Sequence, residues 1–190
     1  MMLTEITFNS NGVRCAAWHV SARSGALSGP AGRPCVVMAN GFGGTRDTGL
    51  LEFAEAFAEA GFDAFVFDYR RFGASEGTPR QHISVRRQRQ DYDAAVAAAR
   101  HLTDRNRIDL WGTSYSAGHC VVVAAQGRLI AAVVSMTPAM DGFATLQHLM
   151  PGRCAQLLEY LVDHFDVYDG PWHERVLSDQ VAFFSRVFAG

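Results

Sequence analysis

Four short apolar runs alternate with segments of helical periodicity, and this alternation restricts the fold more than any other feature of the sequence. The runs cover residues 34–40, 62–68, 107–112 and 129–138. A helix that ends at Gly61, a helix over residues 86–102 and an apolar helix after Gly112 separate them. Continuous apolar strands separated by helices predict an α/β fold, with a mostly parallel sheet covered by helices on both faces. In such sheets ligands bind beyond the carboxyl ends of the strands.

The sequence before this alternation predicts a β-hairpin. Residues 3–8 alternate apolar and polar side chains, Asn11 and Gly12 form a turn signal, and residues 13–20 supply the second strand. Residues 21–33 are typical of a surface loop. No internal repeat or long linker divides the chain, and its 190 residues suit one domain over residues 1–190.

Composition excludes several functional classes. The formal net charge of −2 gives no general attraction to nucleic acid or to anionic lipid, and the basic stretch RRQRQ is typical of a solvated helix face. No apolar run is long enough to cross a membrane and the first residues do not resemble a signal peptide, so we expect a cytoplasmic protein. The four cysteines, Cys15, Cys35, Cys120 and Cys154, have no metal-binding spacing and predict neither a metal site nor a disulfide framework.

The stretch GTSYSAGH, residues 112–119, contains the strongest functional signal. It follows the strand at 107–112 and opens a helix near Tyr115, so Ser114 lies on a sharp strand-to-helix turn. A nucleophile elbow requires small residues two positions to either side, and Gly112 and Ser116 meet that requirement. We therefore expect Ser114, rather than Ser116, to be a nucleophile. The alternative for Ser114 is a serine that only caps the helix.

A serine nucleophile needs a histidine base at the same edge of the sheet. Among the seven histidines, His164 follows an apolar run at 157–162 and precedes a turn, which predicts a loop at the carboxyl end of a strand. His173, in the first turn of the last helix, is the second candidate. The alternative for His164 is an ordinary surface-loop histidine.

Two backbone amides are candidates for an oxyanion hole. One is the N–H of Tyr115, directly after the serine, and the other is that of Phe42 in the turn GFGGT. The alternative for GFGGT is a phosphate-binding turn, but neither G-x-G-x-x-G nor a Lys-Ser/Thr pair is present. We expect no nucleotide and no other cofactor.

Together these segments resemble the α/β-hydrolases, in the bacterial branch similar to dienelactone hydrolase. The matching segments are VVMANGFGGTRD, VFDYRRFGASEG, LWGTSYSAGH and VDHFDVYDG, which with their flanking elements cover nearly the whole chain. The resemblance implies that Ser114 is the nucleophile and His164 the base. It also implies that Phe42 and Tyr115 form the oxyanion hole.

Three departures from the family pattern stand out. Asn40 replaces a common His, and Arg71 replaces a Gly in a loop whose conformation we expect to be altered. Only 26 positions separate Pro138 from His164, too few for the family's lid, seventh strand and acid-bearing loop. We therefore expect an abbreviated hydrolase without a lid, in which a strand at 157–162 pairs beside residues 129–138 and the last helix covers both.

These features predict a serine hydrolase that transfers the acyl group of small apolar esters or thioesters to water. A small-molecule substrate is the expected partner. Apolar residues at the carboxyl edge are candidates for the pocket, with core packing as the alternative for each: Phe72, Met136, Met140 and Phe143. The alternative function is a catalytically impaired relative that binds an apolar ligand or a protein partner.

The acid of the triad is predicted from its position in the chain. Three acidic residues lie between Ser114 and His164, and of these Asp141 follows the strand at 129–138 on the catalytic edge. Asp163 adjoins His164 too closely to reach its ring, and Glu159 lies within the expected strand. Asp141 is therefore the predicted triad acid, with a helix N-cap as its alternative.

Overall fold

Within the residues that the computed structural model describes, 2–126, 129–138 and 172–188, six strands form one sheet. The strands, in chain order, are β1 (Leu3–Ser10), β2 (Val13–Val20), β3 (Cys35–Ala39), β4 (Asp63–Phe67), β5 (Ile108–Thr113) and β6 (Ala132–Met136). The helices are α1 (Leu50–Ala60), α2 (Val85–Leu102), α3 (Tyr115–Ala125) and α6 (His173–Phe188).

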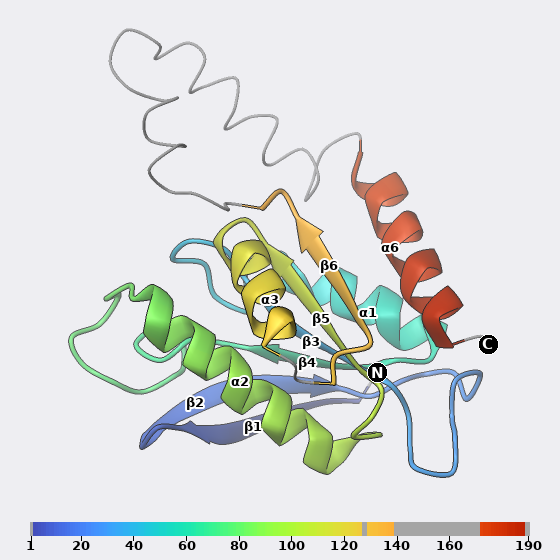
Figure 1. Cartoon of the computed structure of the whole chain (residues 1–190), viewed down its shortest axis with the longest axis horizontal. Helices are drawn as coiled ribbons and strands as arrows, with labels where there is room; N and C mark the ends of the chain where they lie inside the picture. The colour runs from blue at the N-terminus through green and yellow to red at the C-terminus, as the bar shows by residue number, and fades with distance from the viewer. Residues whose placement is uncertain (1, 127–128, 139–171, 189–190) are drawn as a thin grey trace, which may run out of the picture.

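The strand order is β1-β2-β4-β3-β5-β6 (Figure 1). The four strands from β4 to β6 are parallel, whereas the β1–β2 hairpin is antiparallel within itself and to β4. This confirms the predicted α/β class with a mostly parallel sheet. The carboxyl ends of β3, β4 and β5 lie at one edge, where the glycine-rich turn, the loop after β4 and the turn bearing Ser114 meet.

The N-terminal hairpin forms where the sequence predicts it. Ser10 pairs with Val13 across the turn. Asn11 and Gly12 both have positive φ, 49° and 83°, which matches the twist of a tight hairpin.

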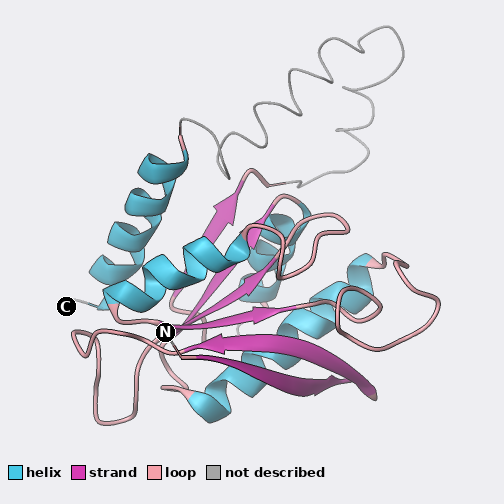
Figure 2. Ribbon diagram, turned by 180° about the vertical axis from the view of Figure 1, so that it is seen from behind, coloured by secondary structure: helices cyan, strands magenta, loops and turns pink. Residues whose placement is uncertain are grey.

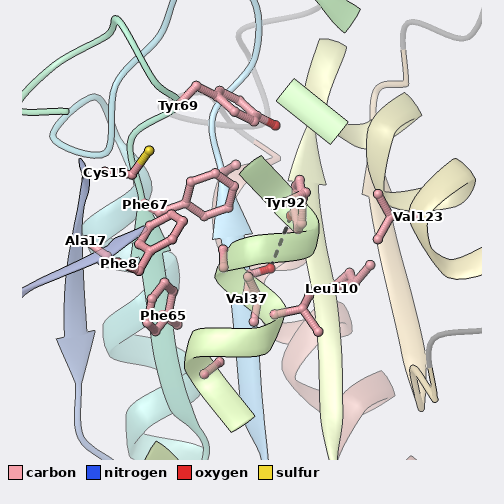
Figure 3. Close-up of a cluster of buried hydrophobic side chains, with 14 of the residues drawn as sticks. Phe8, Cys15, Ala17, Val37, Phe65, Phe67, Tyr69, Tyr92, Leu110 and Val123 are labelled. Atoms are coloured by element: carbon pink, nitrogen blue, oxygen red, sulfur yellow. Dashed lines mark hydrogen bonds between the residues drawn. The ribbon is translucent and has the colours of Figure 1, made fainter. Parts of the chain in front are cut away.

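Helices cover both faces of the sheet, as predicted (Figure 2). On one face α2 and α3 enclose an aromatic and aliphatic cluster in which the Tyr92 hydroxyl donates to the Val37 carbonyl at 3.2 Å (Figure 3). On the other face α1 and α6 cover Trp111 and the apolar side chains around it. The strands between these clusters are buried on both sides, which explains why they are continuously apolar in sequence.

The last helix packs on the sheet through apolar residues at helical spacing. Phe184 is fully buried, and Leu177, Val181 and Phe188 pack against the same cluster. Gln180 accepts a hydrogen bond from the Trp111 indole N–H at 2.6 Å, so α6 is joined to β5 by a polar contact as well.

Several expectations concern residues 139–171. The strand at 157–162 and the absence of a lid lie outside the described residues, as does Cys154. Cys15, Cys35 and Cys120 are buried and free, and all three belong to the core cluster beneath α2 and α3. None of the described helices combines the length and apolar character that a membrane crossing requires.

Candidate functional site

Ser114 is the single residue between β5 and α3, and its backbone is strained. Its φ of 54° and ψ of −113° lie outside the regions that residues with a side chain normally occupy. Such a conformation costs about 1–3 kcal/mol and persists only where its surroundings hold it. Here the Ser114 N–H donates to the Met136 carbonyl of β6 at 2.9 Å. The predicted strand-to-helix turn is confirmed, with the serine at its tip.

Two glycines make room for this turn, which we define as residues 112–116 and call the serine turn. A Cβ on Gly112 would lie 2.5 Å from the Ser116 carbonyl oxygen and 2.6 Å from the Cys120 sulfur. A Cβ on Gly41, two residues after the end of β3, would lie 2.8 Å from the Ser114 Cβ. All three distances are shorter than real Cβ contacts, so only glycine fits at these two positions.

Ser116, the other serine of the motif, is not available as a nucleophile. It is fully buried, and its hydroxyl donates to the Asn40 carbonyl. The Tyr69 hydroxyl lies 2.6 Å from the same oxygen. From the sequence, Ser116 is predicted only as one of the two small residues that the elbow requires, and this hydrogen bond is not predicted. The signal that could have revealed this contact was a hydroxyl at a position where the family pattern has glycine.

The glycine-rich turn, residues 40–45, is organised by the Asn40 side chain. The Asn40 amide nitrogen donates to the carbonyls of Thr45 and Thr48 at 3.0 and 2.7 Å. Its amide oxygen accepts from the Gly41 N–H at 2.7 Å. A Cβ on Gly44 would lie 2.7 Å from the Asn40 Cγ, so the turn wraps closely around this side chain. Asparagine here serves as the internal scaffold of the turn.

Phe42 and Tyr115, the two predicted oxyanion residues, are in contact. Their rings meet edge to face with centroids 5.7 Å apart, although one belongs to the glycine-rich turn and the other to the serine turn. The Phe42 side chain is 71% exposed, which is unusual for an aromatic residue. The ring pair thus forms an apolar surface open to solvent beside Ser114.

A buried carboxylate after β4 braces the glycine-rich turn from the other side. Asp68 accepts from the backbone N–H groups of Arg46 and Ala74 at 2.8 and 3.0 Å, and the Arg46 guanidinium lies 3.3 Å from it. Burial raises the pKa of Asp68 in spite of these donors. In the same loop Arg71 has a φ of 77°, so it occupies a conformation that favours the glycine of the family pattern.

The described histidines of this region have other partners. His119 is buried against the Tyr115 ring at 4.8 Å, and its Nε2 lies 3.2 Å from the Gln88 amide oxygen. Burial, and secondarily the charge of Arg89, lowers the pKa of His119 to about 4, so the ring is neutral at pH 7. His173 opens α6, with its Nε2 3.3 Å from Glu52 on α1.

The remaining predicted site residues divide into two groups. Phe72 and Met136 are 4% and 6% exposed and belong to the two core clusters, so the structure places both in the core. The others lie outside the described residues: His164, Asp141, Met140 and Phe143. A shallow hollow of about 550 Å³ between β1 and α2, bordered by Phe8 and His101, is separate from Ser114. In the described part of the chain no group of three His, Cys, Asp or Glu side chains could hold a metal ion.

Comparison with known proteins gives one family. Residues 34–182 match the family described as "alpha/beta hydrolase fold". The quorum-quenching protein AidA of Acinetobacter baumannii (strain MDR-ZJ06) is 42% identical over 156 residues, which cover 81% of this chain and 50% of that protein. The thiohydrolase aneE of Aspergillus aculeatus is 32% identical over 133 residues, covering 68% of this chain and 41% of that protein.

Solved structures show the same fold. The α/β hydrolase GrgF from Penicillium sp. sh18 superposes with a TM-score of 0.66 at 23% identity, over 84% of this chain and 53% of that one. The chain thus spans about half the length of these relatives. The family match over residues 34–182 includes β3 and the turns around Ser114. By its sequence and by its sheet, this chain belongs to the alpha/beta hydrolase fold family.

Proposed function

We propose that this chain is a serine hydrolase that cleaves small apolar esters or thioesters. In this proposal Ser114 is the nucleophile, His164 the general base and Asp141 the acid that orients it. The backbone N–H groups of Phe42 and Tyr115 stabilise the oxyanion. No metal or other cofactor takes part.

The observation that carries the proposal is the backbone of Ser114. A serine that only caps a helix has an extended backbone, and its side chain accepts a bond from the helix. Ser114 has φ 54° and ψ −113° and makes no such capping bond. The strain is unnecessary for a cap, whereas it exposes the hydroxyl of a nucleophile at the carboxyl edge of the sheet.

The proposed reaction proceeds by two acyl transfers. The Ser114 oxygen attacks the carbonyl carbon while its proton passes to the His164 imidazole, and the carbonyl oxygen becomes an oxyanion. When the tetrahedral intermediate collapses, the alcohol or thiol departs with that proton. Water then attacks the acyl-enzyme by the same route and regenerates Ser114. Asp141 would hold the imidazole in the required tautomer.

The substrate class follows from the surface beside Ser114 and from the relatives. The exposed Phe42 ring and its partner Tyr115 offer an apolar contact for an acyl group. The relative aneE is named a thiohydrolase, which supports a thioester as well as an ester. Met140 and Phe143 remain proposed pocket residues, whereas the burial of Phe72 and Met136 favours core packing for these two.

A covalent probe and a set of chromogenic substrates test the proposal. The 190-residue chain is treated with a fluorophosphonate and the labelled peptide is identified by mass spectrometry. Hydrolysis of p-nitrophenyl esters from acetate to octanoate, and of matching acyl thioesters, is followed in parallel. We expect labelling at Ser114 and activity that Ser114→Ala lowers by at least ~10³-fold.

Ser178→Ala is the matched control, because Ser178 is an exposed serine of α6. It should leave labelling and hydrolysis unchanged. A folded wild-type chain that neither binds the probe at Ser114 nor cleaves any of these substrates would contradict the proposal. That result would favour a catalytically impaired relative that binds an apolar ligand or a protein partner.

A further inference from the structure

We propose that Ser116 and Tyr69 are positioning residues that hold the glycine-rich turn in register with the serine turn, and thereby fix the second oxyanion donor. This inference rests on the proposed function. It concerns the position at which the sequence has G-x-S-x-S in place of G-x-S-x-G.

The Ser116 hydroxyl joins the two turns directly. Ser116 lies on the serine turn and Asn40 on the glycine-rich turn, 76 positions apart in sequence. A carbonyl oxygen can only accept, so the single proton of the Ser116 hydroxyl is committed to Asn40. The Tyr69 hydroxyl, 2.6 Å away, must therefore donate to the Ser116 oxygen. The result is a pair of consecutive hydrogen bonds, which we call the Tyr69–Ser116–Asn40 link, with Tyr69 donating to Ser116 and Ser116 donating to the Asn40 carbonyl.

The Tyr69–Ser116–Asn40 link fixes the peptide group next to the proposed oxyanion donor. The Asn40 carbonyl and the Gly41 N–H belong to one planar peptide group. Ser116 donates to the carbonyl end, while the Asn40 amide oxygen accepts from the N–H end at 2.7 Å. The following peptide group carries the Phe42 N–H. With one plane held at both ends and the turn closed by Asn40, the direction of the Phe42 N–H is restricted.

Tyr69 is itself rigidly held. It is 2% exposed, and its ring packs edge to face against Phe67 at 5.1 Å and against His119 at 6.2 Å. Figure 3 shows Tyr69 at the border of the buried cluster. Burial raises the pKa of the Tyr69 phenol well above its ordinary range, so it keeps its proton at neutral pH. A glycine at position 116 would leave the buried phenol and the Asn40 carbonyl without this partner.

The test separates positioning of the oxyanion donor from general support of the helix. Ser116→Ala removes the link, and Tyr69→Phe removes only its first member. Removal of a whole oxyanion donor costs about 10²–10³-fold in kcat. A donor that is present but loosened should cost less, so we expect kcat to fall by ~10–100-fold in Ser116→Ala and by ~3–10-fold in Tyr69→Phe. KM should stay within about threefold, because the link does not touch the substrate ground state.

Two further readouts are specific to positioning. The affinity for a trifluoromethyl ketone, which forms a tetrahedral adduct with Ser114, should fall in parallel with kcat. The double variant Ser116→Ala/Tyr69→Phe should be no slower than Ser116→Ala alone, since Tyr69 acts only through Ser116. Ser135→Ala is the matched control. Ser135 donates to the Ala117 carbonyl of the same helix at 3.1 Å but does not reach the glycine-rich turn. It should leave kcat unchanged.

Each outcome decides the inference. If Ser116→Ala and Tyr69→Phe keep kcat within twofold of wild type, or if Ser135→Ala loses as much as Ser116→Ala, the inference is overturned and the proposed function stands. If Ser116→Ala does not fold, Tyr69→Phe and its adduct affinity decide. An inactive wild-type chain that no probe labels at Ser114 overturns the proposed function and this inference together.

Discussion

Asp109→Asn should make the protein more stable at neutral pH, although it replaces a fully buried residue. Asp109 lies in β5 between Val36 of β3 and Ala132 of β6. It has no exposed surface, and neither carboxyl oxygen has a hydrogen-bond partner of normal geometry among the described residues. An ionised carboxylate in such a place is strongly disfavoured.

The size of the effect follows from the pKa. Burial raises the pKa of Asp109 from its ordinary value of 3.8 to about 8, and the Ala132 N–H and the Arg107 charge offset only part of that rise. The native protein therefore holds a proton that the unfolded chain releases. This contribution to stability is fully present below about pH 4 and is lost as the pH rises toward about 8. At ~1.4 kcal/mol per pH unit, the loss at pH 7 relative to pH 4 is at most about 4 kcal/mol.

An asparagine amide has nearly the same shape and cannot ionise. It adds an unpaired amide that costs about 1–3 kcal/mol, so the expected net gain at pH 7 is roughly 1–3 kcal/mol. For a chain of this size ~1 kcal/mol shifts Tm by about 2–4 °C. The assay is urea denaturation of wild type and variant at pH values from 4 to 9, with Tm measured in parallel. The difference in unfolding free energy should grow with pH up to about 8 and vanish or reverse near pH 4.

The matched control is Asp179→Asn, since the Asp179 side chain on α6 is 77% exposed. It should give no pH-dependent difference from wild type. A difference between Asp109→Asn and wild type that stays constant from pH 4 to 9 would refute the reasoning, because the carboxyl would then be ionised in both the folded and the unfolded state.

Three further predictions follow from other parts of the molecule. Gly41→Ala should lower kcat by up to ~10²-fold, because its Cβ would lie 2.8 Å from the Ser114 Cβ; Gly25→Ala, whose Cβ would meet only Ser28 at 3.9 Å, is the control. Asp63→Asn should lower the free energy of unfolding by up to ~2 kcal/mol at pH 7 and by nothing near pH 2. Urea denaturation of wild type and variant at these pH values measures the difference. Burial alone would raise the pKa of Asp63, but hydrogen bonds from His19, Arg33 and the Ala22 N–H lower it to about 2, so its contribution is present above pH 3.8 and is lost as the pH falls. Asp141→Asn should lower kcat by about 10⁴-fold with unchanged Tm if Asp141 is the triad acid, and an unchanged kcat would exclude it from that role.

The sequence predicted the features that local pattern determines. The strands β3, β4 and β5 were recognisable because burial on both faces makes them continuously apolar. The serine turn was recognisable because Gly112 and Ser114 have a fixed spacing between a strand and a helix. These are properties of neighbouring residues.

Other features depend on contacts between distant segments, which no local pattern encodes. The Ser116–Asn40 bond exists because β3 and β5 are adjacent in the sheet, and that adjacency brings two turns together. Phe72 and Met136 stand at the edge expected to hold the pocket, yet their packing into the core depends on tertiary neighbours. Apolar character alone could not distinguish a pocket residue from a core residue.

The contacts of Gln180 have a consequence for motion in the molecule. Gln180 accepts from Trp111 and donates to the Met136 sulfur at 3.4 Å, and the Met136 carbonyl is the group that accepts the Ser114 N–H. The last helix is thus joined through one methionine to the strained serine. A local opening that lifts α6 from the sheet would break the Gln180–Met136 contact and leave the Met136 carbonyl held by the β5–β6 pairing alone. If Ser114 is the nucleophile, we expect its intrinsic reactivity to change together with amide hydrogen exchange in α6.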